Sequence, residues 1–140
     1  VGDGPEREKL ESVASELEVS SKVRFTGFRE DPHLFYKIMD IFLLTSFSEG
    51  TAMTLLEAMA SGLPCIVTDV GGNPEIVIKG ETGFVIPSND EKALAEKICT
   101  LLSNTKLKKE MGKAGRRRFE ENFTVEKMVK AYEALYDELV

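Results

Sequence analysis

The sequence predicts an α/β domain with a doubly wound parallel sheet. Three short apolar runs, at residues 41–44, 64–68 and 83–87, each lead through a polar turn into a segment with helical periodicity. Strands that alternate with helices are typical of parallel sheets joined by right-handed crossovers. The chain has 140 residues, 42% of them hydrophobic and 30% charged, so we expect a single domain with a real core over residues 1–140.

The first 40 residues are predicted to form two helices and one strand. The opening VGDGP reads as a strand end and a turn, with Pro5 at the first position of a helix that runs to about Glu18. A strand is predicted at Val23–Gly27, and a short helix follows the loop Phe28–Pro32. This helix contains His33, and a lone histidine is more often structural or exposed than catalytic.

The stretch from Ser46 to Pro64, SFSEGTAMTLLEAMASGLP, is predicted to carry the functional site. It follows the apolar run Ile41–Leu44, which has the pattern of a fully buried parallel strand, and it enters a helix at Met53–Ala60. Ligands of open α/β sheets bind at such junctions, because the carboxyl end of the strand and the free N–H groups of the next helix face one crevice.

Two glutamates bracket this junction. Glu49 precedes the first helical turn, and Glu57 lies in the second turn, roughly 9 Å along the axis at about 1.5 Å per residue. Backbone donors suited to an anion lie between them. A nucleotide-sugar fits this layout, with phosphate at the donors, sugar hydroxyls at one acid and ribose hydroxyls at the other.

A second strand–turn–helix unit follows. A short buried strand is predicted at Pro64–Thr68, and Asn73 has the residue type of an N-cap, with Pro74 as the first helical residue. Gly71 and Gly72 either bring the backbone close to a ligand or form a turn that requires positive φ. The acid that follows them, at position 75, is expected to favour the helix dipole rather than touch a ligand.

The last strand, Gly83–Pro87, precedes a mostly helical C-terminal part. A helix is predicted to start at Asn89-Asp90, and two more are predicted at about Lys106–Asn122 and Val125–Leu139. The basic run Arg116–Arg118 is followed at once by glutamates, so we interpret it as a solvated helix face. Contact with anionic lipid at a membrane surface is the alternative interpretation.

Composition excludes several classes of function. The net charge of −6 argues against a nucleic-acid surface. Cys65 and Cys99 occupy an apolar strand pattern and an amphipathic helix pattern, where thiols behave as small buried hydrophobes, so neither a disulfide nor a metal site is predicted. Without a signal peptide or an apolar run near the ~20 residues of a membrane span, a cytoplasmic location is the default expectation.

Three ordered motifs, SEGTAMTLLEAMASGLP, TDVGGNPEIV and GETGFVIP, resemble the C-terminal nucleotide-binding domain of the family 4 retaining glycosyltransferases. The resemblance covers essentially the whole chain, and the three motifs together are far more specific than a pair of glutamates. It implies an enzyme with two facing Rossmann-like domains. This chain would be the donor-binding half of a hexosyltransferase that moves a sugar from a nucleoside diphosphate to a hydroxyl acceptor.

The resemblance also implies roles for individual residues. Glu49 would bind a hydroxyl of the donor sugar as the catalytic carboxylate, and Glu57 would bind the ribose hydroxyls. Phe28 and Arg29 would flank the base, although a packed phenylalanine and a surface arginine fit the sequence equally well. The donor would be a UDP-, GDP- or ADP-sugar, with no metal and no other cofactor. The backbone amides expected to meet the sugar and the diphosphate are those of Gly50, Thr51, Ala52, Met53, Thr54 and Leu55.

The family also has parts that do not match any segment of this sequence. They are an N-terminal acceptor domain, one or two further strands, and a glycine-rich loop whose arginine and lysine neutralise the diphosphate. We therefore expect a fragment that transfers no sugar by itself, from an enzyme in the cytoplasm or at the cytoplasmic face of the membrane. The family's commonest loop has Gly-Phe-Gly after the first glutamate, whereas this chain has Gly50-Thr51-Ala52-Met53, so the donor sugar is harder to name.

Two other functions stay open at this point. A non-catalytic module that binds a nucleotide or nucleotide-sugar would use the same residues. A glycosidase would need two acids opposed across a scissile bond, whereas Glu49 and Glu57 lie along one loop and helix, so we rank it low.

Overall fold

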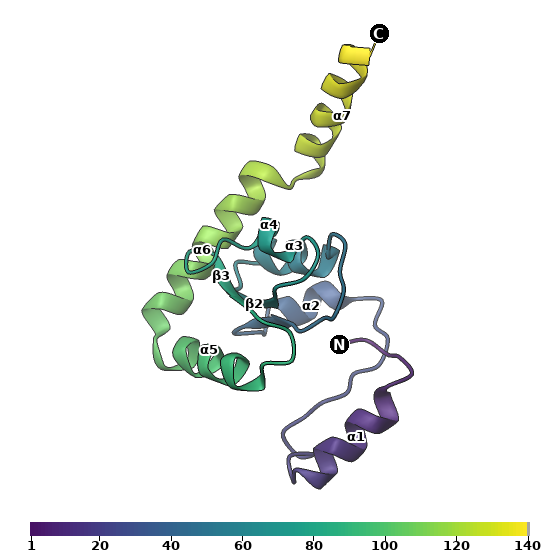
Figure 1. Ribbon diagram of the computed structural model, residues 1–140, viewed down its shortest axis with the longest axis vertical. Coiled ribbons are helices and arrows are strands. Elements are labelled where there is room, and N and C mark those ends of the chain that lie inside the picture. The colour runs from purple at the N-terminus through teal and green to yellow at the C-terminus, as the bar shows by residue number, and fades with distance from the viewer. Residues whose placement is uncertain (140) are drawn as a thin grey trace. The chain divides into compact units, whose positions relative to one another are not determined.

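The computed structural model describes residues 1–139, which divide into two units. The first unit, Val1–Phe35, contains α1 (Arg7–Glu16) and most of the short helix α2 (Pro32–Tyr36). The second unit begins at Tyr36 and contains a sheet with its covering helices (Figure 1). Its elements in the described residues are β1 (Phe42–Leu44), α3 (Met53–Ala60), β2 (Cys65–Thr68), α4 (Asn73–Ile76), β3 (Gly83–Ile86), α5 (Glu91–Ser103), α6 (Thr105–Asn122) and α7 (Val125–Leu139).

The sheet formed by the described residues has three parallel strands in the order β1-β2-β3. Phe42 lies opposite Cys65 in the first pair, and Ile66 lies opposite Phe84 in the second. Helix α3 connects β1 to β2, and α4 connects β2 to β3. The predicted α/β class with a parallel sheet is confirmed.

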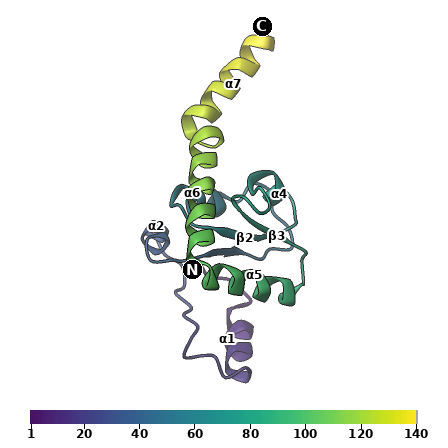
Figure 2. The same ribbon diagram turned by 90° about the vertical axis from the view of Figure 1, so that its left-hand side faces the viewer.

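Strand β2 separates two clusters of buried side chains. Cys65 and Val67 belong to the cluster that includes the buried face of α3, whereas Ile66 belongs to a cluster with Leu101 of α5 and Met111 of α6. Because side chains alternate between the two faces of a strand, this fully buried strand needs cover on both faces. Figure 2 shows this cover, with α5 on one side of the sheet and α4 on the other. The sheet is therefore doubly wound, as predicted.

Two strand predictions need correction. The run Ile41–Leu44 forms β1 but is not fully buried, since Leu43 is 42% exposed. β1 lies at one edge of the described sheet, and α5 packs on β2 and β3. The strand predicted at Val23–Gly27 does not form, because only Gly27 pairs, in an isolated antiparallel bridge with Gly2. A strand needs a continuous ladder of backbone hydrogen bonds.

Most of the predicted helices form. Helices α3 and α7 have the predicted bounds, and α5 starts after Asp90, whose carboxylate accepts a hydrogen bond from the Ala93 N–H at 2.9 Å. Helix α1 is shorter than predicted at both ends. Pro5 lies in the turn before it, and Glu18, with a φ of +54°, lies beyond its last residue.

Asn73 is not the N-cap of α4, contrary to the prediction. The helix begins at Asn73 itself after Gly72, and no side chain caps it. The side chain of Asn73 is fully buried, and its Nδ2 donates to the carbonyl oxygen of Thr68 at 3.1 Å. This hydrogen bond ties the start of α4 to the end of β2.

The two cysteines have different environments. Cys65 is fully buried, as predicted, and burial raises the pKa of its thiol to about 12. Cys99 is exposed on α5, so the prediction of a buried thiol there is wrong. It follows Ile98, which packs on the core, but lies roughly 100° further around the helix. None of the helices in residues 1–139 has both the length and the apolar character that a membrane span requires.

Helix α6 passes close to the turn that follows α3. A Cβ atom built on Gly112 would lie 2.1 Å from the carbonyl oxygen of Gly62. A Cβ atom on Gly115, almost one turn further along the same helix, would have its nearest neighbour at 3.7 Å, an ordinary van der Waals distance. The two glycines therefore differ in steric room within one helix.

Gly112→Ala is expected to lower the free energy of unfolding by about 1–3 kcal/mol, the usual range for overpacking. Gly115→Ala is the matched control, expected to be neutral or stabilising by up to about 1 kcal/mol because alanine favours the helix. Urea denaturation followed by circular dichroism measures both variants. Equal destabilisation by the two substitutions would contradict the steric explanation.

Candidate functional site

Glu49 lies in the loop between β1 and α3, at the carboxyl end of the sheet. The loop precedes the first turn of α3, which begins at Met53. The Ser46 hydroxyl donates to Oε1 of Glu49 at 2.7 Å, and the glutamate is half-buried. Within residues 1–139, Oε2 of Glu49 accepts no hydrogen bond. One oxygen of this carboxylate is held in place, and the other is available as an acceptor.

Two neighbouring strands hold the start of this loop. The carbonyl oxygen of Ser46 accepts a hydrogen bond from the buried Thr68 hydroxyl, at the end of β2, at 2.7 Å. It also accepts a longer one, at 3.4 Å, from the hydroxyl of Ser88, which follows β3. The position of Glu49 therefore depends on all three strands. The roles of Thr68 and Ser88 were not predicted from the sequence. The only indication of them is that each is a polar residue directly after an apolar run.

The turn between β2 and α4 lies against the same loop. The Gly72 N–H donates to the carbonyl oxygen of Gly50 at 3.2 Å. A Cβ atom on Gly72 would lie 2.7 Å from that oxygen, and one on Gly71, whose φ is +52°, would lie 1.7 Å from the carbonyl oxygen of Glu49. The sequence left two interpretations of these glycines, close approach to a ligand or a turn with positive φ. The structure shows positive φ at Gly71, and both glycines approach the backbone of the neighbouring loop.

The N-terminus of α3 presents backbone amides without a side-chain cap. Its N-cap residue is Ala52, whose side chain is buried. The N–H groups of residues 50–54 have no hydrogen-bond partner within residues 1–139. The amide of Leu55, which was predicted to meet the ligand, instead donates to the carbonyl oxygen of Ala52 at 3.0 Å, as a first-turn helical bond. Unpaired amides at the positive end of a helix favour an anion.

Glu57 lies on the exposed side of the second turn of α3. Its Oε2 accepts a hydrogen bond from the Tyr36 hydroxyl at 2.8 Å. Burial and, secondly, this hydrogen bond raise the pKa of Tyr36 well above its ordinary value, so the hydroxyl remains a donor beyond the pH at which a free tyrosine ionises. Sequence reasoning missed Tyr36, because an aromatic residue at the end of a short helix usually only packs.

Phe28 and Arg29 belong to the first unit. Phe28 is 77% exposed, and the Arg29 guanidinium pairs with both carboxylate oxygens of Asp31 at 3.0 and 3.2 Å. The hydrogen bond from Arg29 lowers the pKa of Asp31. The same guanidinium lies 5.7 Å from the ring centroid of Phe35. The assignment of Phe28 and Arg29 to the base stays a prediction.

The basic run Arg116–Arg118 is only partly solvated. Arg116 is exposed and pairs with a glutamate one turn further on, as expected for a helix face. Arg118 is half-buried and donates from Nε to the carbonyl oxygen of Ile76 at 2.8 Å and from Nη2 to that of Glu75 at 2.7 Å. It satisfies carbonyl groups at the end of α4, so the prediction of a solvated side chain is wrong for Arg118.

The remaining ionisable side chains do not suggest a metal site. Among residues 1–139, no group of three or more histidine, cysteine, aspartate or glutamate side chains lies together in a way that would hold a metal ion. His33 is exposed on α2.

Comparison with known families decides the assignment of the chain. The family described as glycosyl transferases group 1 matches residues 1–118. The chain belongs to this family. The solved C-terminal domain of the group 1 family protein LpcC from Francisella tularensis matches it with a TM-score of 0.78 and 27% identity, over 85% of this chain and 63% of that one. The chain is therefore the C-terminal domain of a family 4 glycosyltransferase, as the three motifs indicated.

Individual proteins also match almost the whole chain. The N-acetyl-α-D-glucosaminyl L-malate synthase of Bacillus anthracis is 37% identical over 97% of this chain, which spans only 36% of that enzyme. The structure of Anabaena HepE in complex with UDP matches with a TM-score of 0.90 and 25% identity, over 97% of this chain and 39% of that one. HepE has also been solved with UDP-glucose. These matches confirm the Rossmann-like fold.

Proposed function

We propose that this chain is the donor-binding half of a retaining hexosyltransferase, which transfers a sugar from a nucleoside diphosphate to a hydroxyl acceptor. The observation that carries the proposal is the arrangement of the β1–α3 junction in a member of the group 1 family. Glu49 and Glu57 offer carboxylate acceptors before and after a series of backbone amides without partners. Hydroxyl groups and an anion, joined in one ligand, match these acceptors and donors.

The three parts of the donor would have separate partners. Glu57 binds the ribose hydroxyls, the amides at the start of α3 bind the diphosphate, and Glu49 binds the transferred sugar. Negative charge develops on the leaving diphosphate as its bond to the anomeric carbon breaks, and preorganised amides stabilise that charge without reorganising. The diphosphate therefore leaves more readily from this site than from water.

The donor class to test first is a UDP-sugar. HepE, which matches 97% of this chain, has been solved with UDP and with UDP-glucose. GDP- and ADP-sugars are the alternatives, because the residues of the β1–α3 junction are proposed to bind the ribose, the diphosphate and the sugar, and not the base. A cytoplasmic site of action, with contact at the membrane surface, stays a prediction from the sequence.

Glu57→Ala in the natural full-length protein is expected to weaken nucleoside diphosphate binding by about 1.5–3 kcal/mol, the scale of hydrogen bonds to a charged group. Isothermal titration calorimetry with UDP, GDP and ADP measures the change in Kd. Glu96→Ala is the matched control, since Glu96 is an exposed acid within α5. Unchanged affinity in the Glu57 variant would exclude the ribose assignment.

Glu49→Gln is expected to lower kcat/KM for the nucleotide-sugar at least tenfold, on the order of 1.4 kcal/mol, while the Kd of the nucleoside diphosphate changes less than about threefold. Glutamine keeps an oxygen acceptor for the Ser46 hydroxyl but loses the carboxylate charge beside the sugar ring. Steady-state kinetics and calorimetry on the same preparation separate the two effects. Equal losses in both would place Glu49 at the phosphate or the ribose instead.

The 140-residue chain alone is expected to bind the donor nucleotide but to transfer no sugar. Retaining transfer needs the acceptor hydroxyl held against the anomeric carbon, and such positioning contributes roughly 7–11 kcal/mol to lowering a barrier. A mass-spectrometric transfer assay compares this chain with the full-length protein. Transfer by the purified chain that Glu49→Gln abolishes would refute the prediction. Binding without transfer by the full-length protein would favour the non-catalytic module.

A further inference from the structure

We propose that Tyr36 is a positioning residue for nucleotide binding, which holds the Glu57 carboxylate in the orientation that accepts the ribose hydroxyls. The inference rests on the proposed role of Glu57 and adds a residue outside the β1–α3 junction. It is carried by one contact, the hydrogen bond of 2.8 Å from the Tyr36 hydroxyl to Oε2 of Glu57.

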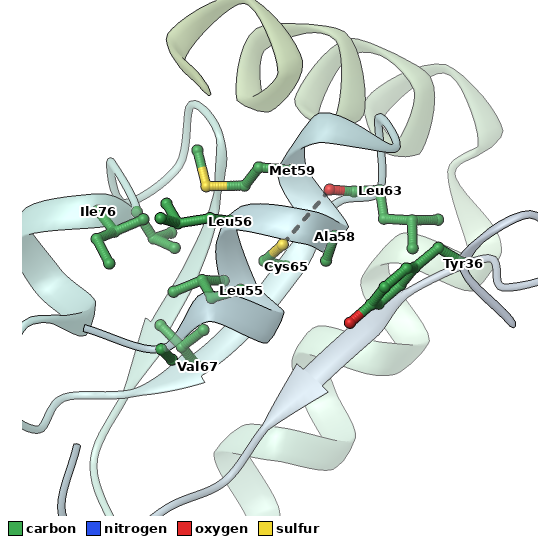
Figure 3. Packing of buried hydrophobic residues seen from close by; sticks show 11 residues of the cluster. Tyr36, Leu55, Leu56, Ala58, Met59, Leu63, Cys65, Val67 and Ile76 are labelled. Atoms are coloured by element: carbon green, nitrogen blue, oxygen red, sulfur yellow. Dashed lines mark hydrogen bonds between the residues drawn. The ribbon is translucent and has the colours of Figure 1, made fainter. Parts of the chain in front are cut away.

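The tyrosine ring is fixed by its packing. Tyr36 is only 6% exposed, and its ring centroid lies 6.0 Å from that of Phe42 in β1. It belongs to the same buried cluster as Leu55 and Met59 of α3. Figure 3 shows the ring beside β1, with its hydroxyl directed toward α3. Because the ring has no room to rotate away, the hydroxyl is a fixed donor near the α3 surface.

The carboxylate, not the nearby backbone, is the main acceptor of this hydroxyl. The Thr54 carbonyl oxygen lies 3.5 Å from the Tyr36 hydroxyl, at the limit of a hydrogen bond, whereas Glu57 Oε2 lies at 2.8 Å. A well-placed backbone carbonyl group would be enough to give a buried hydroxyl its hydrogen bond. Here the hydroxyl instead makes its short hydrogen bond to the side chain of Glu57, an exposed residue. A buried tyrosine is in this way linked to a carboxylate on the surface.

The contact restricts a side chain that would otherwise be mobile. An exposed glutamate samples several rotamers, and ordering it on ligand binding costs conformational entropy. Within residues 1–139, Tyr36 is the only side chain that hydrogen-bonds to the Glu57 carboxylate. Its bond uses one lone pair of Oε2 and leaves acceptor sites on both oxygens for the two hydroxyls of a ribose. Part of the ordering of Glu57 is therefore complete before the nucleotide arrives.

Tyr36→Phe in the natural full-length protein tests the proposal, because it removes the hydroxyl and keeps the packed ring. UDP, GDP and ADP are titrated by calorimetry, and the tightest is used for a double-mutant cycle with Glu57→Ala. We expect Tyr36→Phe alone to weaken binding about three- to tenfold, the range of a net hydrogen-bond contribution. In the Glu57→Ala background, the same substitution should change Kd less than about twofold.

Two controls separate positioning from stability. Thr82→Val removes another buried hydroxyl, which accepts from the Ile78 N–H at 2.9 Å and contacts neither glutamate. It should lower the thermal midpoint without changing Kd. The 2′,3′-dideoxy form of the same nucleotide lacks the ribose hydroxyls, so its Kd should not respond to Tyr36→Phe.

The outcomes distinguish this inference from the proposed function. If Glu57→Ala leaves Kd unchanged, the ribose assignment fails and the role of Tyr36 fails with it. If Glu57→Ala weakens binding but Tyr36→Phe has no effect or tightens it, only the positioning role is overturned. Equal weakening by Tyr36→Phe with and without Glu57, or with the dideoxy nucleotide, would also overturn it, because the effect would then act through the fold.

Discussion

The rest of the structure depends on the complete burial of β2. This strand pairs with β1 on one side and β3 on the other, and its side chains enter both buried clusters in turn. Its last residue, Thr68, binds the loop of Glu49 through its hydroxyl and the start of α4 through its carbonyl group. A shift of β2 by one residue would exchange the two faces and remove both contacts. The register of β2 therefore determines both the packing of the core and the geometry of the site.

The two glutamates reach their positions in different ways. Glu49 sits on a loop held by backbone contacts from the next turn, by a hydroxyl at the end of β2 and by a hydroxyl that follows β3. Glu57 sits on a regular helix whose buried face places it, and one side-chain contact from Tyr36 orients it. The first arrangement fixes where the backbone lies, and the second fixes how a side chain points. The proposed donor site thus combines a loop held by backbone contacts with a helix surface whose acid is held by one hydrogen bond.

The sequence predicted what local patterns encode. The bounds of α3 follow from its apolar periodicity, and the three strands follow from their apolar runs. Side-chain contacts between distant segments were not predictable in this way. Arg118 looks solvated by its neighbours in sequence but binds the end of α4, and Tyr36 looks like core packing but also orients an exposed acid. The strand predicted at Val23–Gly27 does not form. Its residues have the pattern of a strand, but only Gly27 has a backbone partner, in a single bridge with Gly2.

The glycine pair has a consequence for how such a site can change over evolutionary time. Gly71 and Gly72 lie against carbonyl oxygens of the loop and not against its side chains. The contact therefore does not depend on which side chains follow Glu49. The side chains of Thr51 and Met53 are exposed, so substitutions there can alter the chemistry of the proposed donor site while the loop keeps its place. Replacement of either glycine would displace the loop whatever its sequence. Under the proposed function, a new donor preference would therefore arise at the residues that follow Glu49, whereas Gly71 and Gly72 would have to remain glycine.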